Sequence, residues 1–184
     1  MFSSEQVAIR RHVHTFYASA KIQEFGRIVS LKIGIFKRKL YMLLNVSYNN
    51  KQIRDKIDQE VGKPFTLAER IKRRGIGSPK LIITETSIHI NNLLILDSNR
   101  NQCNIEMRPN GIIVGFRSLL ESYALVIPYY KLVIYKGRAA EYSIYRDTYF
   151  IKIEARPNDK AIHNFMNKVL TAKSEAAPTP LEDL

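Results

Sequence analysis

Short runs of alternating apolar and polar residues fill the chain between Leu81 and Ala155, and this period of two constrains the fold more than any other feature. The alternation is clearest over 103–108 and 112–117. Pro109-Asn110-Gly111 lies between these runs. It is typical of a turn, because proline fixes one φ and Asn or Gly accepts a positive one. The pattern predicts a β-hairpin over 103–117 within an antiparallel sheet.

Further alternating runs predict the rest of the sheet. Residues 81–85 and 87–90 are expected to form one or two strands, followed by a turn at Asn91-Asn92 and an apolar run at 93–97. Further strands are expected at 129–135, 141–145 and 149–154, with a loop at 136–138. We expect about seven strands in all.

A helix follows the last strand. We expect it at about 158–170 with Asn158 as its cap. Its apolar residues form one stripe at helical spacing: Ala161, Ile162, Phe165, Met166, Val169 and Leu170. The rest of the chain, 171–184, reads as a flexible acidic tail. The expected domains are therefore a basic, mainly helical region at 1–79, a β-domain with its terminal helix at 80–170, and the tail. The fold class is α+β.

The region upstream of residue 80 carries helical patterns. Ser3 and Gln6 form a capping-box pattern that begins a helix over about 4–24. The segment 28–46 mixes residue types that favour strands with types that favour helices, and we expect a helix in its second half.

Two shorter helices are predicted next. One covers 51–61, and it is ended by Gly62-Lys63-Pro64. The second begins at the capping box Thr66-x-x-Glu69 and extends to about Arg74, with Leu67 and Ile71 turned inward. We expect 75–79 to be a hinge before the β-domain.

The positive charge is concentrated upstream. Residues 1–80 contain 17 Lys and Arg against 6 Asp and Glu, whereas residues 81–184 contain 12 against 11. A surplus of this size points to an anionic partner, which could be nucleic acid, an acidic protein face or an anionic membrane surface. The candidate phosphate contacts are Arg10, Arg11, Lys37, Arg38, Lys39, Arg70, Lys72, Arg73 and Arg74. The alternative is that each basic run is simply a solvated face.

The two helices within 51–74 resemble a helix-turn-helix. The resemblance implies buried positions at Ile57, Val61, Ala68 and Ile71, and a second helix that presents Thr66 and the basic residues 70–74 to phosphates or base edges. Asp58 departs from the motif, because it stands where a tight helix crossing needs a small residue. A plain helical hairpin is the alternative.

A second candidate surface combines aromatic and basic residues of the expected strands. It consists of Tyr129, Lys131, Tyr135, Tyr145 and Lys152, whose rings and cations could stack single-stranded bases. The alternative is that these tyrosines are half-buried strand residues with solvated hydroxyls.

Several other classes of function lack support in the sequence. One cysteine, Cys103, excludes an internal disulfide, and the four histidines lack the spacing of metal ligands. We find no catalytic or cofactor-binding motif, so we expect neither enzyme activity, cofactor nor metal. Without a membrane span or secretory signal, we expect a cytoplasmic protein.

The β-region resembles the bacterial pleckstrin-homology-like (PH-like) domain. The segments LIITETSIHI, VIPYYKLVIYK, EYSIYRDTYFIKIEA and the helix at 158–170 carry the resemblance, which covers about residues 80–170. It implies an antiparallel β-barrel or sandwich of about seven strands, formed by two orthogonal sheets with an open end that the last helix plugs. Lipid-binding members hold inositol phosphates with a basic cluster at the first turn. Here the corresponding turn, 84–87, contains Glu85 and no cation, so the resemblance implies docking on a protein instead.

Our leading hypothesis is therefore a non-enzymatic protein that binds nucleic acid or a ribonucleoprotein through the basic helices upstream. The alternative is a PH-like adaptor that docks on an acidic protein or an anionic membrane surface.

Overall fold

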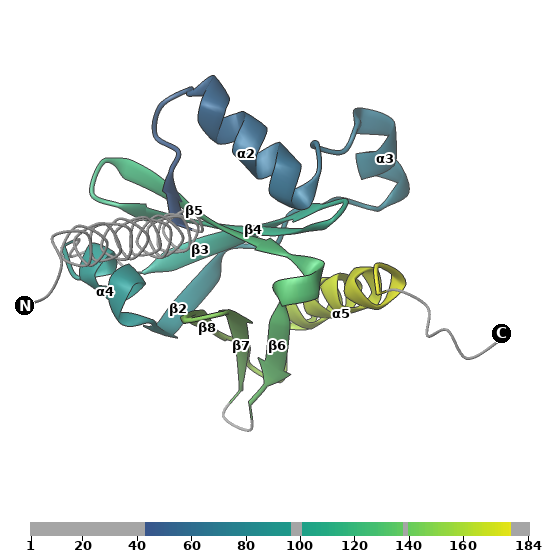
Figure 1. The fold of residues 1–184 in the computed structure, drawn as a ribbon. Coiled ribbons are helices and arrows are strands. Elements are labelled where there is room, and N and C mark those ends of the chain that lie inside the picture. Colours follow the sequence, from purple (N-terminus) through teal and green to yellow (C-terminus); the bar gives the residue numbers. More distant parts are fainter. Residues whose placement is uncertain (1–42, 97–100, 138–139, 178–184) are drawn as a thin grey trace, which may run out of the picture. The chain divides into compact units, whose positions relative to one another are not determined.

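The computed structural model describes residues 43–96, 101–137 and 140–177 of the 184-residue chain (Figure 1). The expected helix at 4–24 and most of the ambiguous segment 28–46 lie outside these residues.

The described residues build one antiparallel sheet of eight strands. The strands are β1 (Leu43–Asn45), β2 (Leu81–Thr86), β3 (Gln102–Arg108), β4 (Gly111–Ser118), β5 (Glu121–Pro128), β6 (Val133–Lys136), β7 (Glu141–Arg146) and β8 (Tyr149–Glu154). Their order is β1-β5-β4-β3-β2-β8-β7-β6, so the sheet is open rather than closed into the expected barrel, with β1 and β6 at its two ends. Together with the helices, the sheet makes an α+β fold.

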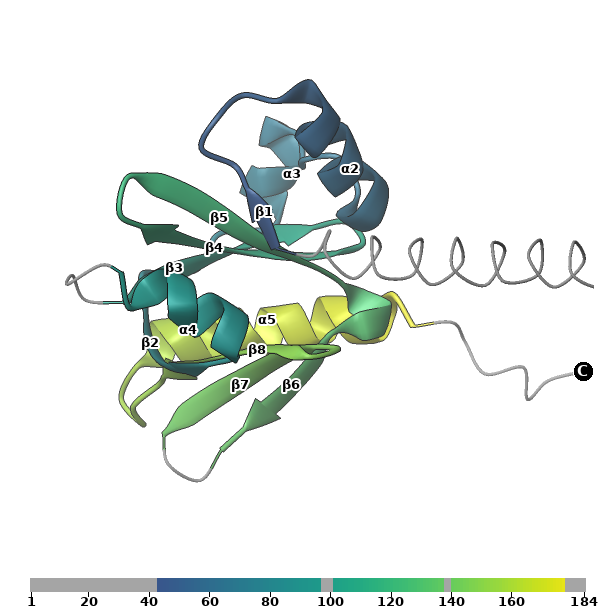
Figure 2. The same ribbon diagram turned by 60° about the vertical axis from the view of Figure 1, so that its left-hand side comes forward.

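Strand β2 joins two halves of the sheet. Leu81 and Ile82 pair with β3, whereas Ile83 and the residues after it pair with β8. The register shifts between Ile83 and Glu85, and such an irregularity bends a strand. The two halves consequently face each other, and Figure 2 shows helix α5 (Lys160–Glu175) running between them.

The main hydrophobic core lies between the two halves. Phe165, Met166 and Val169 of α5 are buried there against inward side chains from both halves. The buried face of the helix thus comes from the middle of the predicted apolar stripe, whereas Ala161 and Leu170 at its two ends are exposed. The helix is preceded by Asp159 rather than capped by Asn158, and it continues through Glu175, five residues into the expected tail. Residues 178–184 lie outside the described part.

The predicted hairpin is confirmed as β3 and β4, but Gly111 has a different role from the expected one. Neither Asn110 nor Gly111 has a positive φ. A Cβ on Gly111 would instead collide with the carbonyl oxygen of Ile127 and with the Val61 side chain. The glycine is needed because β5 and the end of an upstream helix pass so close to it.

A helix replaces one of the expected strands. Residues Ile88–Leu94 form α4, and the strand predicted at 87–90 is wrong. Ile90 and Leu94, four residues apart, are its buried residues, and Ser87 precedes the helix. The i, i+4 spacing of these two residues indicates the helix correctly, whereas the apolar–polar alternation of 87–90 indicated a strand.

Two strands were not expected. β5 is buried on both faces, since Leu125 and Ile127 enter the main core while Ala124 and Val126 enter a second cluster. A strand covered on both sides reads as a continuous apolar run, so it lacks alternation. β1 pairs with β5 at Leu43–Asn45, where we expected a helix. Residues Tyr129–Lys131, expected in a strand, form a 3-10 turn, and β6 begins at Val133.

Helix α2 (Lys51–Val61) has the predicted bounds and lies across the outer face of β4 and β5 (Figure 1). Asn50 accepts a hydrogen bond from Gln52 N at its start, and Gly62 ends it with φ 86°. Its residues Ile57 and Val61 pack against Ile113, Ala124 and Val126, which form the second cluster.

Helix α3 (Leu67–Lys72) has the predicted capping box, but it does not pack as predicted. The side chains of Leu67 and Ile71 are 74% and 71% exposed, and Ala68 is exposed as well. The buried residue of this segment is Phe65, just before the helix. The helix-turn-helix interpretation is therefore wrong in its packing, because α3 buries no residue against α2.

The segment expected to be a hinge is held against β3. Ile76 is buried, and its carbonyl accepts a hydrogen bond from Met107 N. Ser78 N donates to Ile105 O, and Ser78 Oγ accepts from Ile105 N. The compact unit that contains the sheet begins at Met42, so α2 and α3 belong to the same unit as the strands.

Candidate anion-binding surface

Four of the predicted cations lie together on and just after α3. Arg70 and Lys72 belong to the helix, Arg73 ends it, and Arg74 follows with a φ of 53°. All four side chains are exposed. We call these four residues, together with Lys168 of α5, the α3 basic cluster.

The single acidic residue of α3 is engaged at the beginning of the helix. Thr66 N donates to Glu69 Oε2 at 2.7 Å, and Glu69 N donates to Thr66 Oγ1 at 3.4 Å. The bond from the Thr66 backbone is the main reason why the pKa of Glu69 lies below its ordinary value. The positive charge of Arg73 adds a smaller lowering of this pKa, but the hydrogen bonds of the carboxylate are made to the cap.

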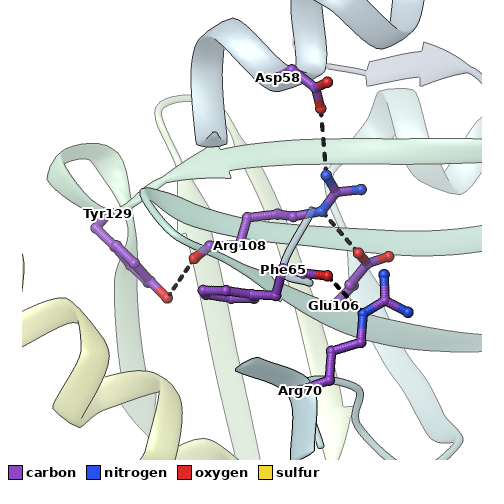
Figure 3. Close-up of polar contacts among 6 residues, drawn as sticks. All are labelled: Asp58, Phe65, Arg70, Glu106, Arg108 and Tyr129. Carbon is purple, nitrogen blue, oxygen red and sulfur yellow. Dashed lines mark hydrogen bonds and ion pairs between the residues drawn. The ribbon is translucent and has the colours of Figure 1, made fainter. Parts of the chain in front are cut away.

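Phe65 anchors two of the arginines. Arg70 Nε donates to the carbonyl oxygen of Phe65 at 2.9 Å, as Figure 3 shows. The guanidinium carbon of Arg73 lies 4.4 Å from the centroid of the Phe65 ring, which is the geometry of a cation–π contact. Because Phe65 is buried in the main core, both arginines are attached to a rigid residue.

Lys168 attaches the end of α3 to α5. Its Nζ donates to the backbone carbonyl oxygens of Arg73 and Gly75. Burial is the main cause that lowers the pKa of Lys168, and the nearby positive charge of Arg73 adds to it. The sequence analysis missed Lys168, because nothing in its local pattern indicates contacts with carbonyls 93 and 95 residues away.

The cluster forms no ion pair with an acidic residue in the described part of the chain, although the charge of Glu69 attracts Arg73. None of the ion pairs in this part of the chain contains a member of the cluster. Other cations of the chain do have partners, as Lys131 does with Asp147 at 3.5 Å and Arg156 with Glu154 at 2.7 Å. The charge of the cluster is therefore presented to solvent.

Arg108 connects helix α2 to strand β3. Its guanidinium lies 3.4 Å from Asp58 of α2 and 2.8 Å from Glu106 of β3 (Figure 3). Tyr129 Oη donates to the carbonyl oxygen of Arg108 at 3.3 Å. Asp58, which did not fit the helix-turn-helix, is explained by this ion pair.

The structure divides the predicted aromatic and basic surface. Tyr135 and Tyr145 are neighbours, with ring centroids 5.8 Å apart, and Phe150 adds a third ring 5.6 Å from Tyr145. Lys152 lies beside Phe150 and forms an ion pair with Glu85.

Two residues of the predicted aromatic and basic surface do not join these rings. Tyr129 is only 5% exposed and belongs to the core, so its assignment to an outer face is wrong. Lys131 is paired with Asp147. The upstream candidates Arg10, Arg11, Lys37, Arg38 and Lys39 lie outside the described residues.

A hollow of about 850 Å³ lies on the outer face of β3, β4 and β5. Its lining contains one carboxylate, Glu106, which is already paired with Arg108. Within the described ranges, no group of three or more potential metal-ligating side chains comes together. This hollow offers no pair of groups suited to acid–base or nucleophilic catalysis.

No protein-family model, curated protein or solved structure matches the chain at a significant level. Among the helices in the described part, none has the length and apolar character that a membrane span requires.

Proposed function

We propose that this is a non-enzymatic binding protein that holds an anionic partner, nucleic acid or a ribonucleoprotein, through the α3 basic cluster. The observation that carries the proposal is the arrangement of Arg70, Lys72, Arg73 and Arg74. Four exposed cations occur within five consecutive residues, without an ion pair in the described part of the chain, on a helix that is anchored at Phe65. A polyanion with regularly spaced charges can contact several of them at once, releasing counterions.

The charge of the whole chain supports a polyanionic partner. The net charge is +12, and residues 1–42 contribute eight Lys and Arg against two acidic residues. Such a surplus accelerates the approach of a polyanion and strengthens its binding at low salt.

Fluorescence anisotropy of a labelled oligonucleotide across a salt series tests this function. We expect the variant Arg70→Gln/Lys72→Gln/Arg73→Gln/Arg74→Gln to bind at least about tenfold more weakly and to show a shallower dependence of log K on log salt. The matched control is Lys51→Gln/Arg54→Gln/Lys136→Gln/Lys160→Gln, which removes four exposed cations from other elements. An equal loss in the two variants, or no binding by the unaltered protein, would contradict the proposal.

A second candidate function is that of a PH-like adaptor docked on an anionic membrane surface or an acidic protein. Two observations favour it. Leu67 and Ile71 are exposed beside the cations, and a surface that combines apolar and basic side chains suits the interface of an anionic bilayer. The two facing halves of the sheet with α5 between them also fit the arrangement that the PH-like resemblance implies.

Vesicle sedimentation separates this candidate from the first. If the adaptor function holds, the protein sediments with vesicles containing phosphatidylserine, and Leu67→Gln/Ile71→Gln weakens this without changing oligonucleotide affinity. Sedimentation that is unaffected by the double substitution would count against the adaptor.

A further inference from the structure

We propose that Arg73 and Lys168 together form a binding site for one phosphate group of the anionic partner. This inference rests on the proposed function and deepens it, because it assigns the tightest contact to two residues from segments far apart in the sequence. The other cations of the cluster then contribute mainly through their charge.

The Arg73 guanidinium is oriented in advance. It lies over the ring of buried Phe65, with its carbon 4.4 Å from the ring centroid. Stacking on a ring uses the face of the guanidinium and leaves the N–H groups at its edge free to donate. Arg73 forms no ion pair with the described residues, so these donors remain for a ligand.

The Lys168 ammonium is held in place by backbone carbonyls at the end of α3. It donates to the carbonyl oxygens of Arg73 and Gly75, which uses two of its three N–H donors. The two carbonyl bonds restrict the lysine side chain, so that less conformational entropy is lost when the third donor binds a ligand.

Two like charges are thereby kept close to each other. The positive charge of Arg73 is one of the causes that lower the pKa of Lys168, after burial. Like charges repel, and in the described part of the chain no carboxylate forms an ion pair with either residue, although the charge of Glu69 also acts on Arg73. A bound anion would relieve this repulsion, so the site favours an occupant with negative charge.

The donors suit a phosphate better than a carboxylate. A planar guanidinium donates two parallel hydrogen bonds to one pair of oxygens, and an ammonium on another element needs a further acceptor. A phosphate group keeps further oxygens outside the plane of the guanidinium, whereas both oxygens of a carboxylate lie in that plane and leave only their remaining lone pairs for the ammonium. Because the whole cluster offers five cations, we commit to the backbone phosphate of a nucleic acid as the source.

The test compares variants of equal charge. Arg73→Gln and Lys168→Gln should each lower the affinity for a single-stranded oligonucleotide about tenfold, because each removes hydrogen bonds to a charged group. Lys72→Gln and Arg74→Gln remove the same charge from adjacent positions and should lower it only two- to threefold. Arg73→Lys keeps the charge but lacks the planar fork, so it should behave like Arg73→Gln. Both Arg73 variants keep the backbone carbonyl that Lys168 contacts, so a loss of affinity in either is not caused by the loss of that bond.

A second measurement does not depend on the oligonucleotide. Inorganic phosphate, titrated into the ¹⁵N-labelled full chain at constant ionic strength, should shift the backbone amide signals of residues 73–75 and 168, and acetate should not.

Absence of oligonucleotide binding together with this localised phosphate response would overturn the nucleic-acid function and support the site. Normal oligonucleotide binding with equal losses in all four single variants, or an acetate response equal to that of phosphate, would overturn the site alone. Vesicle binding that depends on Arg73 without oligonucleotide binding would reassign the source and overturn our choice of nucleic acid.

Discussion

Tyr129 shows how a single buried group connects the core to the candidate surface. Its side chain is 5% exposed, and its hydroxyl donates to the carbonyl oxygen of Arg108, the residue that binds α2 to β3. Burial raises the pKa of Tyr129 to about 12, from an ordinary value of about 10, while the nearby charges of Arg73 and Glu175 act in opposite directions.

We predict that the protein loses stability between pH 10 and 12, in part through Tyr129. In that range the unfolded tyrosine has lost its proton and the folded one has not, so the folded state binds more protons and is destabilised as the pH rises. Tyr129→Phe removes the hydroxyl. The slope of the unfolding free energy against pH should then become shallower by an amount that corresponds to at most one bound proton.

Urea unfolding at several pH values measures this slope. Tyr130→Phe is the matched control, because Tyr130 is the adjacent residue and is 80% exposed. It should leave the slope unchanged. Equal slopes for Tyr129→Phe and the unaltered protein would contradict the assignment.

At the scale of elements, α2 and α3 are neighbours in sequence that contribute to the fold in different ways. α2 packs Ile57 and Val61 against the outer face of the sheet. α3 has two apolar residues at i and i+4, the spacing of a packed stripe, yet both are exposed. Its position depends instead on Phe65 and on the Lys168 bonds to the turn that follows it.

We predict that Leu67→Gln/Ile71→Gln changes the free energy of unfolding by less than about 0.5 kcal/mol, because exposed substitutions remove little buried surface. Ile57→Ala, on the packed helix, should cost about 2–4 kcal/mol. Chemical denaturation monitored by circular dichroism compares the variants. A cost for the α3 pair as large as that of Ile57→Ala would mean that α3 packs after all.

At the scale of the whole molecule, one buried arginine links elements from both halves of the sheet. Arg146 of β7 is 4% exposed, its guanidinium donates to the carbonyl oxygen of Val126 in β5, and it lies 3.5 Å from Glu60 of α2. Burial is the main cause that lowers its pKa, and Glu60 opposes this. The residue occupies an inward position of β7, where the alternation predicts an apolar side chain.

We predict that Arg146→Met lowers the free energy of unfolding by about 1–3 kcal/mol, because it leaves the Val126 carbonyl without its donor. Glu60→Gln should have a smaller effect, since the Glu60 side chain is 48% exposed and its attraction is screened by solvent. Urea denaturation gives both values. An Arg146→Met variant as stable as the unaltered protein would show that apolar packing can replace the link.

Much of the fold was accessible from local patterns. The β3–β4 hairpin, β7, β8, α2 and the capping box of α3 all have signals within a few residues of one another. β1 and β5 were not expected as strands, and their character is set by neighbours distant in sequence. The strand predicted at 87–90 was wrong for a local reason, because the i, i+4 spacing of Ile90 and Leu94 indicates the helix α4 instead. For the candidate site, Arg70 to Arg74 were predicted from charge alone. Lys168 could not be, because only the packing of α5 brings it to Arg73 and Gly75.

The amino-acid sequence by itself determined the α+β class, the alternating strands, the capped helices and the concentration of cations upstream, because each of these depends on the chemistry of adjacent residues. Only the tertiary structure decided which apolar residues are buried and which cations lack acidic partners. Burial and pairing depend on which surfaces meet. Phe65 is close to α3 in sequence but is buried only when the core forms, and Lys168 meets the end of α3 only after the fold has brought segments 95 residues apart together.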